Sequence, residues 1–498
     1  MSTTVAVVAV TLVSVATLAI GAFGLRMSRT TSDFYVASRS VSPALNSSAI
    51  GGEYLSAASF LGIAGLVLVS GPDVLWYPIG WTAGYLLLLV FVAAPLRRSG
   101  AYTIPDFAQV RLQSVLVRRV ATLLVVGVGW LYLMPQFQGA GLTLRTVTGA
   151  PGWLGMVLVA VIVVVNVVAG GMRSITFVQA FQYWLKLTAL LVPAVLLLLA
   201  WRGDGAPPPV APDAWFEPFS TGTPQGLYLT YSVLVATFLG TMGLPHVVVR
   251  FYTNPDGRAA RRTTLVVLAL LGGFYLLPPV YGVLGRVYAP DLVDGAADTV
   301  VLELPGRVLE GGVGDLMSAL VTAGAFAAFL STSSGLTMAV AGVVGQSMTT
   351  WRPLRGRVGS ITALRVSAVL CVLVPLGLAL LAEPIPVASS VTFAFALAAS
   401  TFCPLLVLGI WWRGLTAVGA VTGMVGGGLC ALVATVVAIT ARPGGWAGAL
   451  VSQPAMWTVP VGFALMVLVS LAARDRVPSG VARTMVRLHT PEQVDVRR

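Results

Sequence analysis

Long apolar runs recur from one end of the chain to the other, and they limit the fold more than any other feature of the sequence. A run of about 18 residues or more can cross a bilayer as a helix. Hydrophobic residues make up 57% of the 498 residues and charged residues only 10%, whereas soluble domains have about 25% charged residues. The sequence therefore predicts an all-α polytopic membrane protein with a single domain, 1–498.

Thirteen apolar segments are predicted to be transmembrane helices. They are residues 4–25, 44–69, 76–96, 118–143, 152–170, 175–201, 226–249, 263–287, 315–348, 359–382, 387–411, 415–440 and 456–473. The first segment is too long, and too weakly basic at its start, for a cleaved signal peptide. Residues 474–498 form a polar, basic tail.

The arginines between the segments predict an orientation in the cell membrane. Arginine accumulates in cytoplasmic loops, and one set of alternate loops, with the tail, holds 23 arginines against five in the other set. The N-terminus is therefore expected outside and the C-terminus in the cytoplasm. The net charge of +12 follows from these short loops, which argues against a nucleic-acid-binding surface.

The sequence also argues against an enzyme and against an organic cofactor. The cysteines Cys371, Cys403 and Cys430 lie singly in apolar runs, so neither a disulfide framework nor a zinc site is predicted. His246 and His489 are far apart, and the HExxH and GxxxxGK[ST] motifs are absent from the sequence.

Two predicted helices are interrupted at matching positions. A glycine pair, Gly51 and Gly52, is predicted to break the second segment beside Glu53, and LGTMGLPHV at 239–247 breaks the seventh. The two segments lie five helices apart, so residues 42–201 and 226–411 are expected to form two halves of opposite orientation. Matching interruptions of this kind indicate a transport site near the middle of the membrane.

Two charged residues fall inside predicted helices. A carboxylate such as Glu53 costs at least about 2.5 kcal/mol at the bilayer centre, so we expect it to face a cavity, a cation or a partner. Lys186 is the only lysine of the chain, and Gln179, Gln182 and Tyr183 share its helical face, which is expected to be wet. Three roles are open for Lys186: pairing with Glu53, receiving a substrate carboxylate, or reaching the lipid interface.

Four consecutive hydroxyl residues, 331–334, interrupt the apolar run AAFLSTSSGLTMAV. A single hydroxyl in a membrane helix usually bonds to the carbonyl one turn earlier. Sodium is a hard cation that prefers oxygen ligands. Neighbouring hydroxyls beside unwound carbonyls therefore predict part of a sodium site.

Four longer motifs occur in an order and at spacings typical of one transporter family. They are DFYVASRSVSPALNSSAIGGEYLSAASFLG at 33–62, YTIPDFAQVR at 102–111, GGMRSITFVQAFQYWLK at 170–186 and GTMGLPHVVVRFYT at 240–253. The chain thus resembles the sodium/solute symporter family, and within it the cation/acetate and monocarboxylate branch. The resemblance implies the five-plus-five inverted repeat of the sodium-coupled amino-acid transporters, with one extra helix at 4–25 and two at 415–473.

The resemblance also implies a sodium site and a substrate site. The sodium ligands would be the carbonyls of Gly51, Tyr54 and Ala328 and the hydroxyls of Ser331 and Thr332. The substrate would lie near Glu53, Ser56, Gln136, Gly240, Thr241 and Gly243, because a half-helix N-terminus attracts an anion. The polar face formed by Gln179, Gln182 and Lys186 would line the lumen or take part in coupling. Gate or structural roles are implied for Asp106, His246 and Arg250.

These features together predict sodium-coupled symport of a small monocarboxylate such as acetate, propionate or pyruvate, by alternating access. The expected partners are the carboxylate, the sodium ion and the lipid bilayer, with no obligatory protein partner. Two alternatives remain open at this point. One is coupling to protons through Glu53 or Lys186, and the other is a different solute such as proline, a sugar or a nucleoside.

Overall fold

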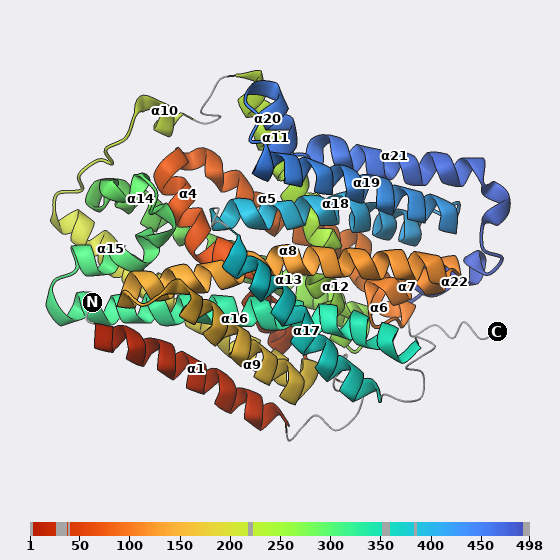
Figure 1. The fold of residues 1–498 in the computed structure, drawn as a ribbon, viewed down its shortest axis with the longest axis horizontal. Coiled ribbons are helices and arrows are strands. Elements are labelled where there is room, and N and C mark those ends of the chain that lie inside the picture. Colours follow the sequence, from red (N-terminus) through yellow and green to blue (C-terminus); the bar gives the residue numbers. More distant parts are fainter. Residues whose placement is uncertain are drawn as a thin grey trace.

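A computed structural model describes residues 3–25, 37, 40–217, 223–350, 359–382 and 386–491, and all regular elements in these ranges are helices. The long helices run roughly parallel across the view of Figure 1, with α1 at the lower left and α22 at the right. The described part of the chain therefore confirms the all-helical class.

The first part of the chain contains the helices up to α9. They are α1 (Thr3–Leu25), α3 (Pro43–Tyr54), the π-helical turn η2 (Ala58–Gly62), α4 (Ile63–Ser70), η3 (Gly71–Leu75), α5 (Trp76–Leu87), the π-helical turn η4 (Leu88–Val92), α6 (Ala93–Ser99), α7 (Ile104–Leu112), α8 (Val115–Thr148) and α9 (Gly152–Gly203).

The second part begins with the short surface helix α10. Its elements are α10 (Asp213–Phe216), α11 (Pro224–Gly243), α12 (Pro245–Val249), η5 (Arg250–Thr253), α13 (Gly257–Tyr275), α14 (Pro278–Tyr288), η6 (Pro290–Val293), η7 (Ala297–Thr299), α15 (Val300–Val308), α16 (Gly311–Thr350), α17 (Ser360–Leu381), α18 (Val387–Trp411), α19 (Ala417–Thr440), α20 (Gly445–Ser452), α21 (Ala455–Ala472), η8 (Arg474–Arg476) and α22 (Val481–His489).

Eleven segments of the described residues are long and apolar enough to cross a membrane. Two of them, Ala58–Ser99 and Gly152–Gly203, contain 42 and 52 residues, whereas one crossing needs about 20. The longer one bends at Gly171, whose φ of 60° and ψ of −164° suit only glycine. The structure thus supports a multi-pass membrane protein, and the count of thirteen stays a prediction.

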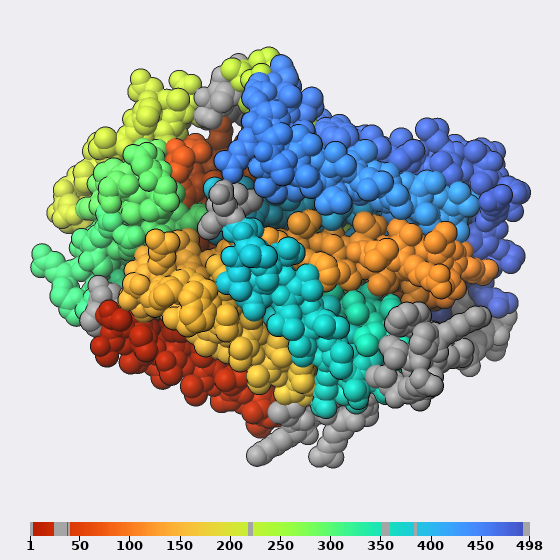
Figure 2. Space-filling view, in the orientation of Figure 1, coloured from red at the N-terminus to blue at the C-terminus, as the bar shows by residue number. Residues whose placement is uncertain are grey.

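The interior of the molecule is formed by helices that are distant in sequence. Helix α9 packs against α3, α8 and α16, and α11 packs against α5 and α18. Figure 2 shows α1 at one edge of the molecule and the C-terminal helices α19 and α21 at the opposite edge. The segments predicted to be additional to the core, α1, α19 and α21, therefore lie at the periphery of the molecule. Helices α3 and α11, which contain or precede the predicted interruptions, pack against α9, α5 and α18 between them.

The first interruption lies later than the sequence predicts. Gly51 and Gly52 are helical residues inside α3, and the helix ends at Tyr54. A Cβ atom on Gly52 would lie 2.1 Å from the carbonyl oxygen of Gln179, and one on Gly51 would lie 2.7 Å from the ring of Tyr183. The glycine pair thus allows α3 to pack closely on α9, and the prediction that it breaks the helix is wrong.

Candidate functional site

The chain leaves helical geometry at Leu55, between α3 and η2, and three other helices compensate the lost backbone hydrogen bonds. In an unbroken helix, the carbonyls of Gly52 and Glu53 would accept from amides four residues later. Here the Lys186 ammonium donates to the Gly52 carbonyl, and the Thr332 hydroxyl donates to the Glu53 carbonyl at 2.6 Å.

A backbone amide that follows the break is also satisfied by a side chain. The backbone N–H of Ala57 donates to Oε1 of Gln136 on α8 at 2.9 Å. The side chains that hold the interruption open therefore come from α8, α9 and α16. Irregular backbone persists at membrane depth only when protein or water satisfies its polar groups, and these side chains meet that requirement.

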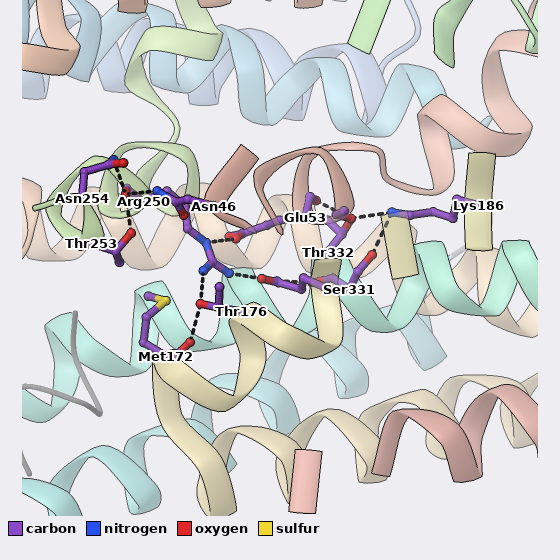
Figure 3. Close-up of polar contacts among 12 residues, drawn as sticks. Asn46, Glu53, Met172, Thr176, Lys186, Arg250, Thr253, Asn254, Ser331 and Thr332 are labelled. Carbon is purple, nitrogen blue, oxygen red and sulfur yellow. Dashed lines mark hydrogen bonds and ion pairs between the residues drawn. The ribbon is translucent and has the colours of Figure 1, made fainter. Parts of the chain in front are cut away.

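Lys186 lies at the centre of this arrangement and is fully buried. Its ammonium donates to the carbonyls of Gly52 and Leu55, the latter at 2.7 Å, and to the Ser331 hydroxyl at 2.9 Å. Figure 3 shows the side chain reaching from α9 toward Ser331 and Thr332. Neither pairing with Glu53 nor a position at the lipid interface fits these contacts, and the role of receiving a substrate carboxylate stays a prediction.

Glu53 pairs with Arg250 rather than with Lys186. Its Oε2 atom lies 2.5 Å from Nε of Arg250, and both side chains are buried. Arg250 also donates to Oε1 of Gln179 and, at 2.9 Å, to the Thr176 hydroxyl (Figure 3). Gln179 in turn donates to the carbonyl of Ser331 at 2.8 Å. Arg250 thus forms a buried ion pair that ties η5 to α3 and α9, and its predicted gate or structural role stays a prediction.

Gly335 on α16 is a part of the site that the sequence reasoning missed. A Cβ atom at this position would lie 2.1 Å from Oε1 of Glu53. The glutamate carboxylate therefore packs directly against the α16 backbone. The glycine that follows the 331–334 hydroxyls was the available signal, but its partner lies almost 300 residues away in sequence.

The second interruption lies at Leu244, between α11 and α12, within the predicted stretch. Cβ atoms on Gly240 and Gly243 would lie 2.5 Å from the carbonyl oxygens of Phe395 and Ala398 on α18. These two glycines therefore serve close packing, as the first pair does.

Thr241 connects the two interrupted helices. Its hydroxyl is hydrogen-bonded to the hydroxyl of Tyr54 at 2.7 Å. Tyr54 is the last residue of α3, and Ser56, which follows it in the break, is buried as well. The structure thus brings Tyr54, Ser56, Gln136 and Thr241 to one region, and their role in binding stays a prediction.

Aromatic side chains that the sequence reasoning did not select surround Tyr54. Its ring packs edge-on against Tyr85, with centroids 4.9 Å apart, and Phe395 lies 6.4 Å away. Trp81 lies 5.8 Å from both Phe395 and Tyr275. Single aromatic residues are common in membrane helices, so only the fold could show that these converge.

Two of these aromatic residues carry unused hydrogen-bond donors. The indole N–H of Trp81 and the hydroxyl of Tyr85 are buried and have no hydrogen-bond partner among the described residues. Buried polar groups in folded proteins are nearly always paired. A polar ligand beside Tyr54 would supply the missing acceptors.

The remaining predicted residues lie away from this centre. Gln182 donates to the hydroxyl of Thr17 on α1 at 3.1 Å, so the expected single wet face of Gln179, Gln182 and Lys186 is divided between different partners. Asp106 lies in the first turn of α7, and its Oδ1 atom is 3.2 Å from Nη2 of Arg118. His246 is buried beside the Tyr132 ring, with centroids 5.2 Å apart.

Four of the five oxygens implied as sodium ligands, all except the Tyr54 carbonyl, have other partners in the structure. The Gly51 carbonyl accepts from the amide of Leu55 at 3.1 Å, and the Ala328 carbonyl accepts from the Ser331 hydroxyl at 3.0 Å. The Thr332 hydroxyl donates to the Glu53 carbonyl. The carbonyls that point at a cation are those of Gly52 and Leu55, each one residue later than implied.

The overall fold is shared with solved transporters. A sodium-coupled sialic acid symporter in a substrate-bound outward-open state superposes with a TM-score of 0.70 at 15% identity, covering 93% of this chain and 97% of that chain. A nucleobase-cation-symport-1 family transporter in a closed conformation with bromovinylhydantoin bound gives a TM-score of 0.56 at 14% identity, covering 92% and 99%. The chain therefore has the same fold as these two transporters.

Sequence comparisons assign the family. The model of the sodium:solute symporter family matches residues 34–427. The chain is 31% identical over 432 residues to the uncharacterized symporter YwcA of Bacillus subtilis, covering 84% of this chain and 83% of the relative. It is 32% identical over 439 residues to the monocarboxylic acid transporter of Corynebacterium glutamicum, covering 82% and 80%. These matches also support sodium as a coupling ion, and the chain belongs to the sodium:solute symporter family.

Proposed function

We propose that this protein carries a small monocarboxylate, such as acetate, propionate or pyruvate, into the cell together with a coupling cation. The observation that carries the proposal is the pair of unused donors on Trp81 and Tyr85 beside the two interrupted helices. A carboxylate is an acceptor with two oxygens, and it would use both donors. The Corynebacterium relative, named a monocarboxylic acid transporter, supports the same substrate class.

Charge at the break also favours an anion. Three buried charged side chains, Glu53, Lys186 and Arg250, lie around the break after α3. Together they carry one net positive charge when all are ionised. The centre of a membrane protein is a poor place for an unbalanced charge. A monocarboxylate bound beside Tyr54 would bring the net charge of this region to zero.

Transport would proceed by alternating access around these helices. The solute enters beside the breaks from the outside, and a second state, in which the same region opens inward, releases it. The coupling cation contributes through its different affinity for the two states. The arginine-rich loops support an orientation with the N-terminus outside and the C-terminus in the cytoplasm.

Uptake by purified protein in proteoliposomes tests the substrate class. Labelled acetate is offered under an inward sodium gradient, with unlabelled propionate, pyruvate, proline, galactose or uridine as competitor. We expect both acids to compete and the other three solutes to leave uptake unchanged. If no acid competes, or if acetate does not enter, the monocarboxylate assignment is wrong.

A matched pair of variants tests the site. Tyr85→Phe removes the unused hydroxyl and keeps the ring, whereas Tyr231→Phe alters an exposed tyrosine of α11. A hydrogen bond to a charged group is worth about 1.5–3 kcal/mol, so Tyr85→Phe should raise the KM for acetate roughly 10- to 100-fold. Tyr231→Phe should not change it, and equal KM values for the two variants would remove Tyr85 from the site.

A further inference from the structure

The ammonium group of Lys186 lies where the family resemblance implies a sodium ion. Its oxygen partners are two carbonyls three residues apart at the end of α3, Gly52 and Leu55, and the Ser331 hydroxyl on α16. Three of the five implied sodium ligands have counterparts here: the Ser331 hydroxyl itself, and two carbonyls three residues apart on α3, each shifted by one residue. The other two, the Ala328 carbonyl and the Thr332 hydroxyl, bond to Ser331 and to the Glu53 carbonyl instead.

The number of contacts matches a protonated lysine. An ammonium group has three N–H donors and no acceptor. Three oxygens, those of Gly52, Leu55 and Ser331, surround Nζ of Lys186. Each donor therefore has one acceptor, and the buried charge is fully hydrogen-bonded without a carboxylate in contact.

A free sodium ion does not fit beside this group. It would need the same oxygens and would lie within a few ångströms of a positive charge in a medium of low dielectric constant, where like charges repel strongly. The only carboxylate of the network, Glu53, is already paired with Arg250. Sodium would raise the net charge of the three side chains from one positive to two.

We propose that Lys186 is a built-in cation that takes the place of sodium at this position of the fold. Its side chain holds the freed carbonyls of the broken helix against α16, and its charge is available to offset a bound carboxylate. The second role rests on the proposed function, whereas the first does not. Any sodium ion that couples transport then binds elsewhere in the protein.

Sodium binding by the full-length protein in lipid nanodiscs tests this proposal without any transport measurement. The probe is ²²Na⁺, and the first comparison is between the wild-type protein and Ser331→Ala. If Lys186 fills the site, Ser331→Ala should leave the sodium dissociation constant within twofold of the wild-type value. A tenfold or greater weakening would show that sodium binds these oxygens, and it would overturn the proposal.

The second comparison removes the lysine. Lys186→Ala frees both the oxygens and the volume of the side chain, so this variant should bind one more sodium ion per protein than the wild type. The additional ion should disappear in Lys186→Ala/Ser331→Ala, and Lys186→Arg, which keeps a cation, should not gain it. A Lys186→Ala protein that elutes as a single peak but gains no sodium contradicts the proposal.

The two proposals can fail independently. Absence of acetate uptake by the wild-type protein would overturn the monocarboxylate assignment and leave the sodium-binding result unaffected. Conversely, normal acetate uptake together with loss of sodium binding in Ser331→Ala would overturn only the role of Lys186. The first comparison also requires no variant of the buried lysine, so it stands even if such variants do not fold.

Discussion

At the scale of single residues, the buried pair of Glu53 and Arg250 makes the clearest energetic prediction. Removing one member of a buried ion pair leaves an uncompensated charge and costs about 3–5 kcal/mol, whereas replacing both by neutral groups is often close to neutral. Glu53→Gln and Arg250→Met should therefore each lower the melting temperature in detergent strongly. The double variant should melt closer to the wild-type protein than either single variant does.

The control for this cycle is an ion pair at the surface. Arg307 and Asp291 lie 2.6 Å apart, and both are partly exposed, so solvent screens their interaction. Asp291→Asn should leave the melting temperature almost unchanged. If the Glu53 and Arg250 single variants are as mild as this control, the buried pair does not stabilise the region in the way described.

At the scale of elements, the interruption after α3 depends on donors from other helices. Thr332→Val keeps the shape of the side chain and removes the hydroxyl that bonds to the Glu53 carbonyl. Leaving a buried carbonyl unpaired costs about 1–3 kcal/mol, so the variant should unfold at lower temperature and take up solute more slowly than the wild type.

Thr337 on the same helix provides the matched control. It is buried, but its hydroxyl has no partner among the described residues. Thr337→Val should therefore be neutral or slightly stabilising, because no hydrogen bond is lost. Equal behaviour of the two threonine variants would show that the Thr332 contact does not support the break.

The glycines of α3 lead to a prediction about helix packing. Gly52→Ala places a methyl group against the backbone of α9, and overpacking of this kind typically costs about 1–3 kcal/mol. Gly272→Ala on α13 introduces the same methyl group where nothing lies within 4 Å. We expect a lower melting temperature and slower uptake only for Gly52→Ala. Similar values for the two variants would contradict the close-packing role.

The comparison of α3 with its sequence shows what can be predicted from residues alone. The length of an apolar run is visible in the sequence, so the ends of a helix can be predicted to within a few residues. The predicted segments 387–411 and 415–440, for example, correspond to α18 (Val387–Trp411) and α19 (Ala417–Thr440). The predicted break at Gly51 and Gly52 precedes the observed one at Leu55, because glycine can either interrupt a helix or allow close packing. Only the contact of Gly52 with α9 distinguishes the two. The actual break depends on Gln136, Lys186 and Thr332, which lie far away in sequence.

In the candidate site, too, some features can be predicted from the sequence and others depend on contacts between distant residues. Glu53 and Lys186 stand out in the sequence because charges are rare inside membrane helices. Their partners could not be predicted, since Glu53 meets Arg250 from the other half of the chain and Lys186 meets backbone carbonyls. Trp81 and Tyr85 carried no signal at all, because apolar helices contain many aromatic residues that only pack against neighbours.

At the scale of the whole molecule, the proposed orientation predicts which loops face outward. Asp294 lies in the segment after α14 and Arg483 in the tail helix α22, and both are exposed. In intact cells, a membrane-impermeant maleimide should label a cysteine introduced by Asp294→Cys, but one introduced by Arg483→Cys only after permeabilisation. Labelling of Arg483→Cys alone in intact cells would reverse the topology.

The central claim is that the two interrupted helices form a transport site for a small carboxylate, and acetate counterflow tests it most directly. Proteoliposomes loaded with unlabelled acetate are diluted into labelled acetate with equal salts and pH on both sides, so the result does not depend on which cation is coupled. We predict a transient accumulation of label that is abolished by external propionate and strongly reduced in Tyr85→Phe. Liposomes that accumulate no more label than protein-free controls would contradict the account.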